Sequence, residues 1–142
     1  MRKKFSSALL AIFIIAAIQP AYAMSADSTP AQEKLSHKEA QEECHALQAN
    51  PPASLKLIRS APPAFPLSAL KAHQEGWVLV SFTLNEKGKV KHPTLIDHGG
   101  DKAFIKPALK AMKKFRYEPI VKDGQAVSVS GMKYCFTFAI SE

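Results

Sequence analysis

The feature that most constrains this chain is an alternating run of apolar residues from Gly76 to Leu84. Its period of two, rich in β-branched and aromatic side chains, predicts a strand with one buried face. The two faces carry Val78, Val80, Phe82 and Leu84 on one side and Trp77, Leu79, Ser81 and Thr83 on the other.

A second strand is predicted after a tight turn. Residues 85–88, Asn-Glu-Lys-Gly, favour a short hairpin loop because Gly88 can adopt a positive φ. Residues 90–96 would then return antiparallel to the first strand. Pro93 lacks the N–H group that a central strand uses, so this second strand is expected at a sheet edge. A hairpin alone is barely stable in water, and other elements must therefore pack on it.

An N-terminal helix is predicted over residues 31–49, where good helix formers run without an internal Gly or Pro. Thr29 and Gln32 form a capping-box pattern at its start, and Asn50 precedes the prolines that end it. The apolar stripe of this helix is narrow and includes Cys44. Packing would hold such a helix weakly, which makes a covalent tether a sensible supplement.

Two shorter segments connect this helix to the hairpin. Residues 55–59 are predicted to be extended, and the proline-spaced chain after them to be extended or turn-like. Residues 66–74 then favour a short helix with Pro at its start. That helix is expected to turn Leu67 and Leu70 inward, with Ala69 as a further candidate.

Beyond the hairpin, residues 102–115 place apolar side chains at helical spacing, with Asp101 as a candidate cap. Pro107 disfavours a regular helix there, so the helix either begins late or bends. Residues 116–121 are predicted to be extended and, after a turn, residues 127–140 to form a long last strand.

These elements predict an α+β fold. A strand–helix–strand crossover commonly leaves room for one strand between the two. Residues 76–84 are therefore expected in the middle of a three-stranded antiparallel sheet, between residues 90–96 and 127–140. Two helices, residues 66–74 and 102–115, would cover one face. The extra N-terminal helix would cover the other face, and one edge of the last strand would stay unpaired.

The first residues have the composition of a targeting segment. Basic residues precede an apolar run of 11 residues from Ala8 to Ile18, which is short of the roughly 20 that a permanent anchor needs. An Ala-Tyr-Ala sequence then fits a signal peptidase site. We predict a cleaved signal peptide over residues 1–23 and export to the periplasm, followed by a helix and linker over 24–61 and a domain over 62–142. An uncleaved inner-membrane anchor is the alternative, and only then is membrane contact expected.

Charge and cysteine count fit an exported protein. The formal net charge of +7 falls to +4 without the three basic residues of the leader, and this modest excess does not indicate nucleic acid binding. Cys44 and Cys135 are the only cysteines, and an even count in an exported chain predicts a disulfide between them. The alternatives are two free thiols, or a reactive Cys44 beside His45.

The residues around the hairpin and the second long helix match a known pattern. The run FPLSALKAHQEGWVLVSFTLNEKGKV, the run ALKAMKKFRYEP at residues 108–119 and the closing strand resemble the C-terminal domain of TonB. The resemblance covers residues 62–140, and its most specific part is the helix exit. Phe115 stands where that family often has Trp, and Pro107 is an irregularity.

The resemblance implies an energy-transducer-type domain without enzymatic activity. In that family the open edge of the last strand captures an extended peptide from an outer-membrane transporter, by strand addition. Core or turn roles for Phe65, Tyr117 and Pro119 remain an open alternative. A homodimer through the same edge is also compatible. The candidate partner contacts are Phe65, Pro66, Arg116, Tyr117, Glu118, Pro119, Val127, Val129, Gly131 and Met132.

The chain departs from TonB proper in its N-terminal region. TonB has an uncleaved anchor and a long proline-rich stalk, whereas here the leader has a cleavage signal and only residues 24–61 precede the domain. We therefore expect a free periplasmic binding module rather than a transducer of proton-motive energy. The alternative is an envelope-associated structural protein that binds peptidoglycan or another periplasmic protein.

Enzyme and metal chemistry find little support. The sequence has no nucleophile-elbow, zinc-protease or phosphate-loop motif, so neither an enzyme nor a cofactor is expected. One predicted helix carries His37, Cys44 and His45, but their spacing does not gather three metal ligands on one side. Lysines along residues 102–113 could attract anionic lipid, lipopolysaccharide or glycan, although a solvated helix face is the simpler explanation.

Overall fold

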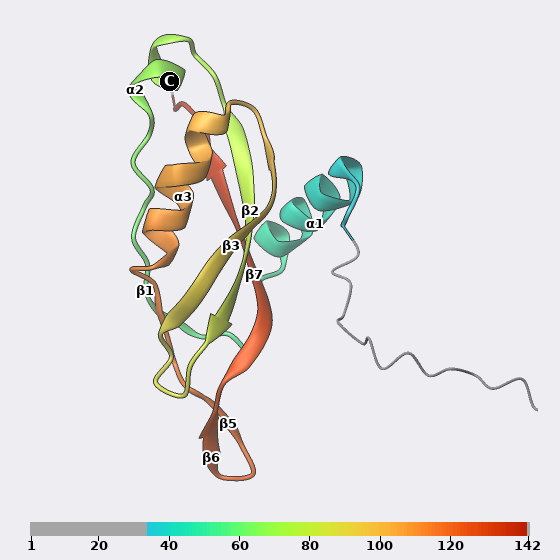
Figure 1. Cartoon of the computed structure of the whole chain (residues 1–142), viewed down its shortest axis with the longest axis vertical. Helices are drawn as coiled ribbons and strands as arrows, with labels where there is room; N and C mark the ends of the chain where they lie inside the picture. Colours follow the sequence, from blue (N-terminus) through green and yellow to red (C-terminus); the bar gives the residue numbers. More distant parts are fainter. Residues whose placement is uncertain (1–33, 142) are drawn as a thin grey trace, which may run out of the picture. The chain divides into compact units, whose positions relative to one another are not determined.

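A computed structural model describes residues 34–141 of the chain (Figure 1). Most of the predicted elements are present, several with shifted bounds. In chain order they are α1 (His37–Ala49), β1 (Leu57–Arg59), α2 (Leu67–Lys71), β2 (Gly76–Leu84), β3 (Val90–Gly99), the 3-10 turn η1 (Lys102–Phe104), α3 (Ile105–Met112), β4 (Arg116–Tyr117), β5 (Ile120–Lys122), β6 (Gln125–Val127) and β7 (Val129–Phe138).

The main sheet has three antiparallel strands in the order β3-β2-β7. The prediction that β2 is central is confirmed, and Pro93 lies on the edge strand β3, where its missing N–H is tolerated. Asn85 closes the hairpin, since its N–H donates to the carbonyl of Lys89 at 3.0 Å. Gly88 has a φ of 72°, the left-handed conformation that the turn requires.

One face of the sheet carries the larger core. Phe104 and Phe138 pack with ring centroids 4.5 Å apart, and α3 lies along this face (Figure 1). Asp101 caps the start of η1, and its carboxylate accepts the N–H of Ala103 at 2.8 Å. The regular helix begins at Ile105, so the chain accommodates Pro107 in the first turn of α3, where a proline costs no hydrogen bond.

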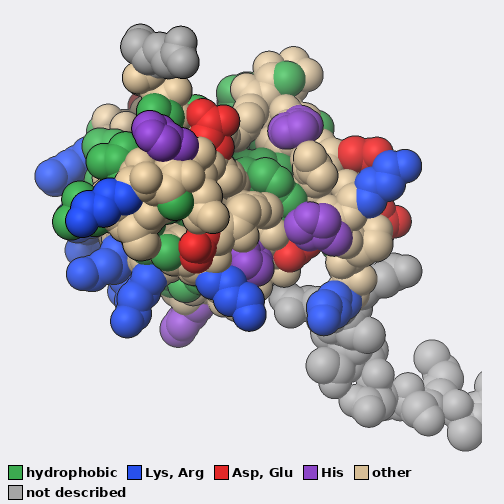
Figure 2. Space-filling model, turned by 90° about the horizontal axis from the view of Figure 1, so that it is seen from above, with side chains coloured by type: hydrophobic (Ala, Val, Ile, Leu, Met, Phe, Trp, Pro, Cys, Tyr) green, Lys and Arg blue, Asp and Glu red, His purple; other side chains and the backbone are tan. Residues whose placement is uncertain are grey.

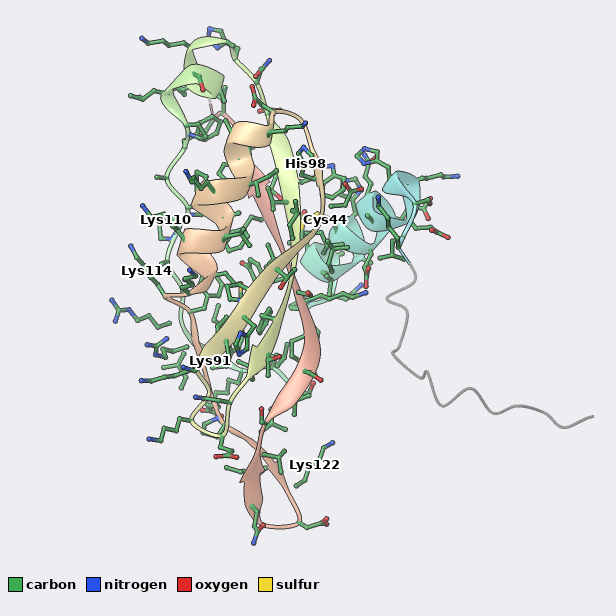
Figure 3. The ribbon with its side chains drawn as sticks, viewed as in Figure 1. Cys44, Lys91, His98, Lys110, Lys114 and Lys122 are labelled. Atoms are coloured by element: carbon green, nitrogen blue, oxygen red, sulfur yellow. A yellow bond between two sulfur atoms is a disulfide. The ribbon has the colours of Figure 1, made fainter. Side chains whose placement is uncertain are left out.

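The opposite face is covered by α1, as the sequence predicted. Cys44 on α1 and Cys135 on β7 form a disulfide. Around it lies a small second core of Ala40, Trp77 and Leu79. In Figure 3, Cys44 lies on α1 against the sheet, on the side away from α3. The disulfide therefore joins the N-terminal helix to an edge strand of the sheet.

The predicted start of the N-terminal helix was wrong. The helix begins at His37, and Ser36 is its cap in a capping box with Glu39. Lys34 and Leu35, predicted helical, lie before it, and the Thr29 signal falls outside the described residues. Two capping-box patterns occur in this sequence, and the later one coincides with the point where the chain reaches the sheet.

The predicted inward face of α2 was wrong for Leu67 and Leu70 and right for Ala69. Leu67 and Leu70 are 72% and 44% exposed, whereas Ala69 is fully buried. The helix is only 5 residues long and lies at one end of the sheet (Figure 1). Such a short helix offers one contact position to the core, and the small Ala69 permits the close approach.

The last strand is shorter than predicted. Residues 125–127 form β6, which pairs with β5 in a separate hairpin, and Ser128 separates it from β7. Likewise, the extended segment after α3 divides into β4, which pairs with β1, and β5. Near its start β7 contains a bulge, where Gly131 has a φ of 74° and the register with β2 shifts. Regular pairing with β2 therefore runs from Met132 to Phe138.

Candidate functional site

The candidate site is the outer flank of β7. This strand ends the order of the main sheet, so β2 pairs with one flank and no strand of the described chain pairs with the other. An open strand edge presents unpaired backbone N–H and C=O groups and is a template for another extended chain. The prediction that the last strand keeps one unpaired edge is confirmed.

The hairpin turn determines which groups of β7 face outward. In an antiparallel strand, successive residues direct their backbone groups to alternate sides. The backbone N–H of Asn85 donates to the carbonyl of Lys89, on the β3 side. The backbone groups of Leu84, the preceding residue, must therefore point toward β7. Consistent with this, the Leu84 carbonyl accepts a hydrogen bond from the Ser128 hydroxyl at 3.0 Å. At each register shift, the additional residue lies on β3 or β7 and not on β2. The backbone groups of β2 therefore alternate between its two neighbours without interruption.

It follows that the even-numbered residues of β2 bond to β7. Their partners are Phe138, Phe136, Tyr134 and Met132, which direct their backbone groups inward. The outward groups then belong to Lys133, Cys135 and Thr137. Consistent with this alternation, the N–H of Ile140 points inward and donates to the Glu75 carboxylate at 2.9 Å.

A groove of about 360 Å³ runs beside this flank. The chain after β1 forms one wall, with Ala61, Pro62 and Pro63, and the Gln48 side chain lies at the other wall. Between them lie Phe115 and the β7 residues from Tyr134 to Thr137. The open flank of β7 is therefore recessed between two walls rather than fully exposed.

A second cavity, of about 430 Å³, continues the groove on the α1 face. It is lined by the polar side chains of α1 and by the end of β7, from Thr137 to Ala139. Gln48 and Thr137 line both cavities, and the Gln48 side-chain amide donates to the Thr137 hydroxyl. The same amide lies 3.6 Å from the sulfur of Cys135.

Tyrosines on the other face of the sheet are held in their neutral form. Burial raises the pKa of Tyr117 above its ordinary value, with a smaller contribution from Tyr134. Burial also raises the pKa of Tyr134, whose ring lines the groove. The Tyr134 hydroxyl can act as a hydrogen-bond donor or acceptor.

Several exposed lysines lie on the α3 side of the domain. The exposed lysines of the α3 side include Lys106, Lys110, Lys113 and Lys114, and Lys110 and Lys114 project away from the sheet in Figure 3. Figure 2 shows most of the visible Lys and Arg side chains at the left of the view, with others at the right. The α1 side carries Glu43, which pairs with Lys133 of β7 at 2.5 Å. The lysine face and the open flank of β7 are thus different surfaces.

The structure separates the residues that the sequence named as partner contacts. Phe65 packs edge-on against Phe104 and Phe138 and is part of the core. Pro66 precedes α2 as its cap residue. Tyr117 is buried and stacks on Phe82 with ring centroids 5.7 Å apart.

The remaining candidates lie on three strands, β4, β6 and β7, and on the loop between β4 and β5. Arg116 pairs with Arg59 across β1 and β4, Glu118 forms an ion pair with Lys56 at 2.7 Å, and Pro119 is exposed between β4 and β5. Val127 pairs with Ile120 in the separate hairpin. Only Val129, Gly131 and Met132 lie on β7. Val129 and Gly131 lie before or at its bulge, and Met132 is the first residue of the regular pairing with β2.

The sequence did not identify the residues that present the outward groups, Lys133, Cys135 and Thr137. The alternation of β7 showed that these three share a face, but side-chain alternation alone does not say which flank their backbone groups occupy. Only the pairing of Asn85 with Lys89 settles that point. Gln48, which lines the groove from α1, gave no signal in the sequence.

Within residues 34–141, no group of His, Cys, Asp and Glu side chains is arranged to hold a metal ion. Among the helices of the described region, none has the length and apolar character to cross a bilayer.

Comparison with known proteins identifies the family. The family model described as Gram-negative bacterial TonB protein C-terminal matches residues 61–140, more than half of the chain. This chain belongs to the TonB C-terminal family. A relative, Protein TonB of Pseudomonas aeruginosa, is 30% identical over 84 residues, which are 59% of this chain and 25% of that protein. The chain thus matches about a quarter of its relative's length.

One solved structure supports the same assignment. The solution structure of the Pseudomonas aeruginosa TonB C-terminal domain matches with a TM-score of 0.53 and 29% identity, over 65% of this chain and 92% of that one. The TonB2 protein of Vibrio anguillarum matches with a TM-score of 0.48 and 31% identity, over 61% of this chain and 82% of that one. The family match begins at residue 61, so α1 lies outside it.

Proposed function

We propose that this chain is an exported periplasmic binding module, which captures an extended segment of an outer-membrane transporter or another envelope protein by adding it to β7. The main support is the row of outward backbone groups on Lys133, Cys135 and Thr137, at the β7 edge of the sheet and recessed in a groove. Strand addition supplies affinity through backbone hydrogen bonds and specificity through side-chain pockets. Membership of the TonB C-terminal family supports a transport-related protein partner.

The proposed role requires no enzymatic step. The cleaved leader, residues 1–23, would release the domain into the periplasm, where a disulfide such as Cys44–Cys135 is stable. The partner contacts we propose are the outward groups of β7 and the walls of the groove. Val129, Gly131 and Met132 would contact the partner where it passes the bulge, whereas Phe65 and Tyr117 would act through packing.

A substitution that blocks one backbone donor tests this function. Thr137→Pro removes an N–H that faces the open flank, and it leaves the hydrogen bonds between β7 and β2 intact. Thr137→Ala is the matched control, because it removes the same side chain and keeps the N–H. Each protein would be used as bait in detergent-solubilised outer membranes of the source bacterium.

We expect wild type and Thr137→Ala to retain transporters and Thr137→Pro to lose them. Equal retention by the proline variant would contradict strand addition. The structural alternative predicts a different result, namely co-sedimentation with purified peptidoglycan that the proline does not change. Concentration-dependent dimerisation lost in Thr137→Pro would indicate instead that the edge pairs with a second copy of the chain.

A further inference from the structure

The helix α1 lies outside the family match and is nevertheless attached to the edge strand. Three side-chain links join it to β7: the Cys44–Cys135 disulfide, the Glu43–Lys133 ion pair, and the hydrogen bond from Gln48 to Thr137. The three β7 residues in these links are the same three whose backbone groups face the open flank. α1 therefore holds the residues that would pair with an added strand.

A strand added to β7 would continue the pleat of the sheet. Residues directly opposite each other on paired strands place their side chains on the same face. Partner residues opposite Lys133, Cys135 and Thr137 would therefore turn toward α1. The residues between them would turn toward the wall of Ala61 and Pro63.

The two walls differ in chemistry. The wall on the α3 face is largely apolar, with Pro62, Pro63 and the rings of Phe115 and Phe136. On the α1 side, Gln41, His45 and Gln48 recur at helical spacing and are exposed, and His37 lines the same second cavity. Of these residues, Gln48 also lines the groove beside β7. A glutamine amide offers both donors and an acceptor.

A side chain beside this polar wall must satisfy those groups. A neutral amide or hydroxyl can both donate and accept, and so complements a glutamine. The Gln48 amide already donates to Thr137. An apolar side chain would bury the remaining donors and acceptors of the glutamine amides without partners, which costs free energy. A carboxylate would add negative charge to a cavity that Glu75 already lines.

We infer that α1 is a specificity element of the strand-addition site: its residues Gln41 and Gln48 select partner segments that alternate apolar side chains with neutral polar ones, the polar side chains facing α1. This inference rests on the proposed function. It names the ligand class as an extended segment with Ser, Thr, Asn or Gln at every second position. The disulfide keeps the selecting helix in register with β7.

A displayed library of random octapeptides provides the test. It would be selected on immobilised full chain, as wild type, as Gln41→Ala/Gln48→Ala and as Thr137→Pro. The matched control is Gln125→Ala, an exposed glutamine on β6, away from the groove. Emission of the single tryptophan, Trp77, which lies beneath α1, reports whether the helix stays docked in each variant.

We expect wild type and Gln125→Ala to enrich alternating peptides. For one enriched peptide, replacing a polar residue by Ala should weaken binding to wild type by about 3- to 10-fold, the worth of one hydrogen bond. The same replacement should weaken binding to Gln41→Ala/Gln48→Ala less than about 2-fold.

An unchanged polar preference in the Gln41→Ala/Gln48→Ala variant would overturn the inference and leave strand addition intact. Two other results would instead overturn the proposed function. One is peptides that bind Thr137→Pro and wild type with equal affinity, and the other is a wild type that enriches no peptide. The two failures are thus distinguishable.

Discussion

The backbone N–H of Tyr117 donates a hydrogen bond of 2.9 Å to the carbonyl of Gly88. This bond joins the β2–β3 turn to β4, which lie 29 residues apart in the sequence. A Cβ atom on Gly88 would overlap the Tyr117 carbonyl oxygen, and the φ of Gly88 is already positive. The turn glycine is therefore required twice, for its own conformation and for the approach of β4.

Gly88→Ala is expected to be strongly destabilising. A positive φ costs a side chain roughly 1–2 kcal/mol, and the overlap with backbone adds to that cost. Gly124→Ala is the matched control, since Gly124 also has a positive φ, of 78°, but open space around its Cβ position. Urea unfolding should show a loss of about 3 kcal/mol or more for Gly88→Ala and about 1 kcal/mol for Gly124→Ala. Equal losses would contradict the role of the close approach.

The stability of the domain should fall at alkaline pH. Burial raises the pKa of Tyr117 and Tyr134, so the unfolded chain releases these protons first as the pH rises. Stability is then complete below the ordinary tyrosine pKa of about 10 and decreases above it. Tyr117→Phe keeps the ring and removes the ionisation. Between pH 9.5 and 11, Tyr117→Phe should lose about 0.5–1 kcal/mol less unfolding free energy than wild type. Equal losses in the two proteins would show that Tyr117 does not cause the pH dependence.

The disulfide should control the docking of α1. Its ends are 91 residues apart, and a loop of this length contributes about 4–5 kcal/mol in the chain-entropy treatment. Cys44→Ala/Cys135→Ala should lower the free energy of unfolding by about 2–4 kcal/mol. Trp77, 9% exposed beneath α1, should shift its emission to longer wavelength. Reduced wild type should behave similarly, and an unshifted emission in both would show that packing alone holds α1.

The Glu43–Lys133 pair should be coupled more strongly than a surface pair. Its side chains are 29% and 33% exposed, and the second carboxylate oxygen of Glu43 is buried with no hydrogen-bond partner in residues 34–141. A double-mutant cycle with Glu43→Ala and Lys133→Ala should give a coupling of about 1 kcal/mol. The pair Lys38–Glu42, with 85% and 68% exposed side chains, should give about 0.3 kcal/mol. Similar values would mean that burial adds nothing.

Much of this fold follows from local sequence patterns. The alternation of β2 and the turn at Asn85–Gly88 define the hairpin, and Pro93 places β3 at an edge. The helical spacing before Phe115 predicts α3. Two cysteines in one chain leave a single possible pairing, which the structure contains. These features depend on residues that are close in the sequence, or on a pairing with only one possibility, so they can be predicted from the sequence alone.

Other features depend on contacts that no local pattern specifies. The start of α1 uses the Ser36–Glu39 capping box. The sequence also contains the pattern of Thr29 and Gln32, and no local rule ranks one above the other. Leu67 is exposed because α2 reaches the core only through Ala69. Ser128 ends β6 because residues before it pair with β5 rather than β2.

The sequence by itself determined the strands, the main helices and the faces of the sheet, because side-chain periodicity records burial. Only the tertiary structure decided which backbone groups of β7 remain open and that Gln48 lies beside them. The reason is physical: backbone groups alternate between the flanks of a strand, and the pairing at Asn85 and Lys89 sets the phase of that alternation for the whole sheet.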